Sequence, residues 1–172
     1  SLDTGLAAIR DRAKVFLADG ITEVSNPGSY STKDVLADYA AYLRKLVDLS
    51  HVKPMRVVVD AANGMGGLTV PAVLSTAAGL TKLPIEIIDM YFELDGTFPN
   101  HIANPIEPEN IKDLIERVKA EKADVGLAFD GDGDRAVLID EKGNALSGTT
   151  MTAMLADYFL KKQPGSTILY NA

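Results

Sequence analysis

The sequence contains no cysteine and no tryptophan, and its only imidazoles are His51 and His101. Without cysteine the chain has no disulfide bond, no thiolate nucleophile and no cysteine metal ligand. Zinc favours nitrogen and sulfur ligands, so two histidines give little reason to expect a zinc site. Thiol chemistry is therefore excluded, and zinc chemistry is not expected.

An excess of positive charge and a long apolar run are also missing. The 17 Lys and Arg residues against 24 Asp and Glu residues give a formal net charge of −7. Such a surface repels a nucleic-acid backbone and an anionic membrane, so we expect neither as a partner. No apolar stretch approaches a membrane span, and the first residues show no basic segment followed by an apolar one. We therefore expect a cytoplasmic protein, in which an anionic substrate would need a local cation.

What is present is the composition of a globular protein. Of the 172 residues, 47% are hydrophobic and 24% are charged, and a chain of this length can bury a sizeable core. There is no low-complexity tract and no clear internal repeat. The chain begins without methionine, on a helical pattern, so we expect it to be part of a longer protein.

The apolar pattern predicts helices first and then an alternation of strands and helices. Two helices are expected before residue 50, over residues 6–17 and after Ser31, which is a candidate cap. Beyond that point the expected strands are residues 56–59, 85–89, 125–129, 136–139 and 167–170. The expected helices between them are residues 68–78, a segment beginning at Pro108, and residues 150–161. This order predicts an α/β fold of three layers, a mainly parallel sheet with helices on both faces.

The most informative segment is an acidic loop, residues 130–135, which contains Asp130, Asp132 and Asp134 with glycines between them, followed by Arg135. In a straight strand, residues two apart lie about 6.6 Å from each other. Two ligands of one Mg²⁺ ion are at most about 4.2 Å apart. The intervening glycines allow the backbone to curl until the three carboxylates converge.

Converged carboxylates need a cation. At about 5 Å, each pair repels by about 3 kcal/mol at an effective dielectric constant near 20. The acidic loop follows an apolar strand, and ligands of open α/β sheets bind beyond the carboxyl ends of strands. We therefore predict that Asp130, Asp132 and Asp134 bind Mg²⁺, and that Arg135 binds a phosphate or the substrate.

The acidic loop has three alternative interpretations. A solvated acidic turn is the simplest, but plain turns rarely carry three aspartates at this spacing beside an apolar strand. A Ca²⁺-binding EF-hand matches at Asp130, Asp132, Asp134 and Glu141, but has Arg135 where glycine is required and strands where helices are required. A haloacid-dehalogenase-like phosphatase would use Asp130 as nucleophile and Asp132 as acid/base, although Asp134 stands where that family has a small residue. A Ca²⁺-binding structural module and this phosphatase remain the alternatives.

The acidic loop and its apolar lead, residues 126–135 (GLAFDGDGDR), closely resemble the metal-binding loop of the α-D-phosphohexomutases. Three further segments share the resemblance: residues 57–66 (VVVDAANGMG), residues 95–101 (DGTFPNH) with the prolines that follow, and residues 3–10 (DTGLAAIR). The first two resemble parts of the second domain of that family, and the third resembles the end of its first domain.

The resemblance implies a phosphomannomutase or phosphoglucomutase that interconverts hexose 1-phosphate and hexose 6-phosphate. It implies a phosphoserine, a bisphosphate intermediate and Mg²⁺ as cofactor. The chain lacks the Ser-His-Asn-Pro motif that carries the phosphoserine, and Ser25 is not assigned this role because no histidine follows it. We therefore expect no catalytic nucleophile in this chain and no turnover by the chain alone, with the nucleophile in an upstream domain.

With this resemblance, residues 1–52 are expected to be the tail of the upstream phosphoserine domain with a linker helix, and residues 53–172 the Mg²⁺-binding α/β domain. The expected partners are a hexose phosphate and the remaining domains of the mutase.

Gly64, Gly66 and Gly67 match neither the dinucleotide nor the P-loop spacing, so we interpret them as a strand-to-helix turn. His101 is given no catalytic role.

Overall fold

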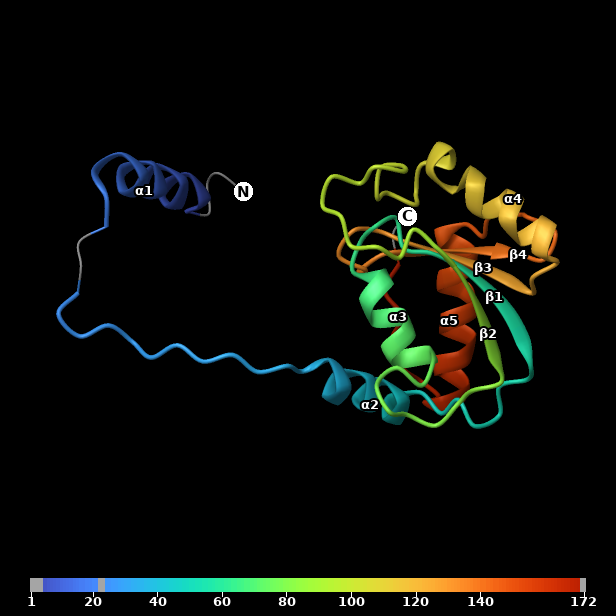
Figure 1. Ribbon diagram of the computed structural model, residues 1–172. Helices are drawn as coiled ribbons and strands as arrows, with labels where there is room; N and C mark the ends of the chain where they lie inside the picture. The colour runs from blue at the N-terminus through green and yellow to red at the C-terminus, as the bar shows by residue number, and fades with distance from the viewer. Residues whose placement is uncertain (1–4, 22–23, 171–172) are drawn as a thin grey trace. The chain divides into compact units, whose positions relative to one another are not determined.

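The computed structural model describes residues 5–21 and 24–170, so Asp3 and Thr4, which contribute to the family resemblance, lie outside the described residues. Contacts divide the chain into two units, residues 1–33 and 34–172. The first unit contains helix α1 (Leu6–Asp19), in which no residue is buried. The second unit contains all the strands and the remaining helices (Figure 1).

The second unit is built on a sheet of four strands, β1 (Met55–Asp60), β2 (Ile85–Met90), β3 (Val125–Phe129) and β4 (Ala136–Asp140). The strand order is β2-β1-β3-β4. Strand β1 pairs in parallel with both β2 and β3, whereas β4 returns antiparallel to β3. The prediction of a mainly parallel sheet is confirmed.

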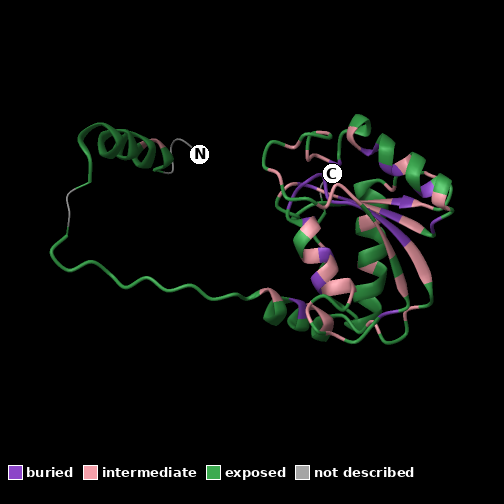
Figure 2. Cartoon of the chain, viewed as in Figure 1, coloured by how far each residue is buried: buried purple, intermediate pink, exposed green. Residues whose placement is uncertain are grey.

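Helices cover both faces of the sheet because β1 is apolar on both faces. Val58 packs with α4 (Lys112–Glu121), in a core that includes Leu114 and Val118. Val57 and Val59 point to the other face, where they pack with Val70 of α3 (Gly66–Leu74). The buried residues accordingly gather on the central strands and on the sheet-facing sides of these helices (Figure 2). The predicted three layers are confirmed.

The remaining helices are α2 (Leu36–Leu46), the 3-10 turn η2 (Pro108–Ile111) directly before α4, and α5 (Gly148–Lys162). The predicted cap at Ser31 is wrong, because the helix begins five residues later and the Asp34 carboxylate accepts the Leu36 N–H at 2.9 Å. Pro108 opens η2, as its position in the sequence predicted. No described helix is long and apolar enough to cross a membrane.

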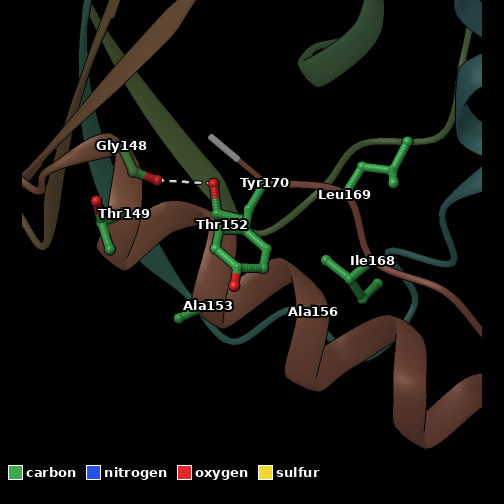
Figure 3. A pocket seen from close by; sticks show the side chains of 8 residues that line it. All are labelled: Gly148, Thr149, Thr152, Ala153, Ala156, Ile168, Leu169 and Tyr170. Atoms are coloured by element: carbon green, nitrogen blue, oxygen red, sulfur yellow. Dashed lines mark hydrogen bonds between the residues drawn. The ribbon is translucent and has the colours of Figure 1, made fainter. Parts of the chain in front are cut away.

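The predicted strand at residues 167–170 does not form. These residues pair with neither edge strand of the described sheet, β2 or β4. Instead, Ile168, Leu169 and Tyr170 line a hollow with Ala153 and other small side chains of α5 (Figure 3). No residue of α5 is buried.

Candidate metal centre

The acidic loop connects β3 to β4 as a tight hairpin. Phe129 and Ala136 are the last paired residues, so residues 130–135 form the connection. The Gly133 N–H donates to the Asp130 carbonyl at 3.1 Å, and the Asp130 N–H donates to the Arg135 carbonyl at 3.2 Å. Gly133 has a φ of 76°, a conformation that a side chain disfavours, which is why this turn requires glycine.

The hairpin brings the three predicted metal ligands together. One carboxylate oxygen from each of Asp130, Asp132 and Asp134 lies within 4.8 Å of the others. Asp130 is fully buried, whereas Asp132 and Asp134 are exposed. An oxygen-only carboxylate set suits a hard cation such as Mg²⁺, and ligand distances of about 2.1 Å require the three oxygens to close to within about 4.2 Å of one another when the ion binds. The residues present therefore fit Mg²⁺.

Arg135 holds the buried member of this set. Its backbone N–H donates to Asp130 Oδ1 at 3.0 Å, and its Nε donates to Asp130 Oδ2 at 2.6 Å. Nε also lies 3.5 Å from Asp134 Oδ1, and Nη1 donates to Asn104 Oδ1 at 3.3 Å. Half of the Arg135 side chain is exposed, so an anion can approach it from solvent.

The carboxylates respond differently to this environment. Burial alone would raise the pKa of Asp130, but hydrogen bonds from the Arg135 backbone and side chain outweigh it, and the pKa is lowered. The pKa of Asp134 is raised by its hydrogen bond to Asp130 and by the negative charges of Asp132 and Asp130. The pKa of Arg135 is raised by Asp130. The raised pKa of Asp134 thus reflects its hydrogen bond to Asp130 together with the repulsion between the carboxylates, and a bound cation would relieve this repulsion.

Two other segments of the carboxyl edge touch the acidic loop. The turn after β1 reaches it through Met65, whose N–H donates to the Gly131 carbonyl at 2.9 Å. The long 91–105 loop reaches it through Phe98 and Asn104. Gly64 lies so near that a Cβ on it would be 2.5 Å from the Gly131 carbonyl oxygen. The predicted strand-to-helix turn thus also packs directly against the acidic loop.

Asp60 and Asn104 belong to this edge and were missed from the sequence. Asp60 is the last residue of β1, and its register partner Ala128 lies two residues before Asp130. The rule that ligands gather at the carboxyl ends of strands could have identified it. His101 does not join the metal ligands, since its Nε2 lies 2.9 Å from Asp60 Oδ2.

Comparison with known proteins gives the family. Residues 37–143 match the model of the family described as phosphoglucomutase/phosphomannomutase, alpha/beta/alpha domain II. This match covers more than half of the chain, and the chain belongs to this family. The matched residues include all four strands and the acidic loop, and they end before α5.

Individual relatives agree with the family match. A phosphomannomutase/phosphoglucomutase of Pseudomonas aeruginosa is 38% identical over 96% of this chain and 33% of its own length. A phosphomannomutase of Vibrio cholerae is 36% identical over 98% of this chain and 36% of its own length. A crystal structure of a phosphoglucomutase/phosphomannomutase family protein from Burkholderia thailandensis superposes with a TM-score of 0.75 at 31% identity, covering 93% of this chain and 33% of that one. The chain thus spans about a third of the length of its relatives.

Proposed function

We propose that this chain supplies the Mg²⁺ centre of a phosphohexomutase. The enzyme would interconvert hexose 1-phosphate and hexose 6-phosphate, with mannose and also glucose as the sugar, through a phosphoserine and a bisphosphate intermediate. The phosphoserine would come from another domain of the enzyme, upstream of the acidic loop. The observation that carries the proposal is the convergence of Asp130, Asp132 and Asp134 at the carboxyl edge of a sheet of this family.

Each side chain of the acidic loop has a role in this proposal. Asp130, Asp132 and Asp134 would hold the cation, which when bound neutralises charge on the phosphoryl group in transfer. Arg135 keeps Asp130 ionised and oriented, and its exposed guanidinium would bind a phosphate oxygen of the phosphoserine or the substrate. This chain would bind the cation, orient the phosphoryl group and neutralise its charge, while the nucleophile would come from another domain of the enzyme.

The two alternatives fit the geometry less well. An EF-hand places its Ca²⁺ loop between two helices, whereas this loop lies between strands β3 and β4. A phosphatase of the haloacid-dehalogenase kind would need Asp130 as a nucleophile open to the substrate. Asp130 is fully buried, and both of its carboxylate oxygens accept hydrogen bonds from Arg135.

The proposal is tested first by calorimetric titration of the chain with Mg²⁺. Asp132→Asn should weaken binding at least tenfold without lowering the thermal unfolding temperature, because Asp132 is exposed and its negative charge repels its neighbours. Asp157→Asn, an exposed aspartate on α5 paired with Lys161, is the matched control and should bind as the wild type does. A loss of thermal stability in Asp132→Asn with unchanged Mg²⁺ affinity would favour a structural module instead.

Turnover supplies the second test. In the complete enzyme, Asp132→Asn should abolish conversion of mannose 1-phosphate to mannose 6-phosphate while the fold is retained. The chain alone should show no conversion, because it would lack the phosphoserine. Conversion by the isolated chain would refute this division of labour.

A further inference from the structure

A fully buried carboxylate lies next to the acidic loop and is not among the proposed metal ligands. The Asp60 side chain is 1% exposed. Its Oδ1 accepts the Ala62 N–H at 2.8 Å, and its Oδ2 lies 2.9 Å from His101 Nε2. Burial raises the pKa of Asp60. Since a buried carboxylate without a partner is strongly unfavourable, Asp60 depends on His101.

The two bonds of the imidazole define where its protons lie. His101 Nδ1 is 3.0 Å from the Ile102 carbonyl oxygen, which only accepts, so Nδ1 carries a hydrogen. Nε2 faces a carboxylate oxygen, so a second hydrogen must lie between Nε2 and Asp60 Oδ2. The resulting bond is shielded from solvent, because the His101 side chain is only 15% exposed. The Tyr91 ring packs edge-on against the imidazole, and its hydroxyl donates to Asp113, whose negative charge contributes to the raised pKa of Asp60.

This pair joins two segments that are 41 residues apart in sequence. One is the end of β1, where Asp60 also accepts the Ala62 N–H of the following turn, and the other is the 91–105 loop. Asn63 adds two bonds between the same segments, donating from Nδ2 to the Glu93 carbonyl at 2.9 Å and accepting at Oδ1 from Asn100 at 2.8 Å. The turn and the loop are therefore fastened to each other beside β1.

Both fastened segments contact the acidic loop. The turn contacts it through the Met65 N–H bond to the Gly131 carbonyl. The 91–105 loop contacts it through the Phe98 ring, which would lie 3.2 Å from a Cβ on Gly131, and through Asn104, which accepts from Arg135. The His101–Asp60 pair thus supports the two segments that pack against the acidic loop, the turn after β1 and the 91–105 loop, without contacting the carboxylates of the acidic loop.

We propose that His101 is a positioning residue for the metal centre, which through Asp60 keeps the turn and the 91–105 loop rigid against the acidic loop and so raises its affinity for a divalent cation. Three like charges stay together only where the backbone cannot open, and preorganisation of this kind depends on the supporting residues. The inference rests on the proposed metal function.

The test measures binding of Mn²⁺, a hard divalent probe, by electron paramagnetic resonance on the full chain, with thermal unfolding in parallel. His101→Ala should bind Mn²⁺ about tenfold more weakly at temperatures where it is folded. His101→Gln, whose amide can donate to Asp60, should recover most of the affinity. His51→Ala, the other histidine, is exposed and should bind as the wild type does.

Asn104→Ala tests the contact between the 91–105 loop and the acidic loop alone, because it removes only the side-chain hydrogen bond to Arg135 and leaves Asp60 paired. It should weaken Mn²⁺ binding by a smaller factor. The double variant with His101→Ala should be no weaker than His101→Ala alone if the two residues act along the same route. Full additivity of the two effects would contradict the proposed route.

The outcomes separate this inference from the proposed function. A folded His101→Ala chain with wild-type Mn²⁺ affinity and a lowered unfolding temperature would overturn the positioning role and leave the metal centre intact. If His101→Ala does not fold, the other two variants decide. The positioning role is overturned if Asn104→Ala binds Mn²⁺ as the wild type does and His101→Gln does not bind Mn²⁺ with near-wild-type affinity. A wild-type chain that binds Mn²⁺ no better than Asp132→Asn would overturn both.

Discussion

Gly64 offers a steric test of the link between the β1 turn and the acidic loop. A Cβ at this position would lie 2.5 Å from the Gly131 carbonyl oxygen and 2.8 Å from Gly131 Cα. Ordinary carbon-to-oxygen contacts are about 3.3 Å. In Gly64→Ala, the backbone of the acidic loop must therefore retreat by about 0.8 Å, the difference between these two distances. Gly64 is not among the residues with positive φ, so alanine adds bulk without backbone strain.

A shift of this size should disturb the metal centre more than the fold. Overpacking costs about 1 to 3 kcal/mol of unfolding free energy. Misplacement of a functional group by about 1 Å can cost about 100-fold in activity, and altered support of metal ligands about 10- to 100-fold in affinity. We expect Gly64→Ala to weaken Mg²⁺ binding at least tenfold, measured by calorimetry, with a folded circular dichroism spectrum.

The matched control is Gly96→Ala, in the 91–105 loop. A Cβ there would meet no atom within 4 Å, so Mg²⁺ affinity should not change. Wild-type affinity in a folded Gly64→Ala chain would refute the reasoning, since it would mean that the acidic loop does not depend on its contact with the turn.

Two further predictions concern stability. Leu114 is fully buried between α4 and the sheet, so Leu114→Ala should lower the free energy of unfolding in urea by about 3 kcal/mol; a loss below about 1 kcal/mol would contradict the assigned core. The pKa of Asp140 is lowered by hydrogen bonds from Asn144 and from the Lys142 N–H. Its contribution to stability is therefore present above the unfolded-state pKa and is lost as the pH falls through the folded-state pKa. Asp140→Asn should lose less thermal stability than the wild type between about pH 5 and pH 3, and parallel losses would contradict this.

The sequence predicted the sheet well because its signals are local. Residues 125–129 were expected as a strand and form β3 with the same bounds, since an apolar run ends there at the glycine-rich acidic loop. The two-faced burial of β1 followed from its run of valines. The loop geometry that gathers the three aspartates follows from the spacing of glycine and aspartate within six residues.

Features that depend on distant partners were missed. Residues 167–170 have the apolar character of a strand, but strand formation also needs pairing with a distant segment, and these residues pair with neither edge strand of the described sheet, β2 or β4. The cap of α2 is a local exception, since Asp34 lies closer than Ser31 to the first turn of the helix. The pairing of His101 with Asp60 spans 41 residues, and no local pattern records it. The sequence therefore predicted the proposed ligands of the metal centre but not the residues that support them.

The central claim is that Asp130, Asp132 and Asp134 share one hard divalent cation. The most direct measurement is a crystal structure of the chain grown with Mn²⁺, using the anomalous signal to locate the ion. We predict a single peak at about 2.1 to 2.4 Å from one carboxylate oxygen of each of the three aspartates. Three side chains directed to separate regions of solvent, with no ion between them, would contradict the claim.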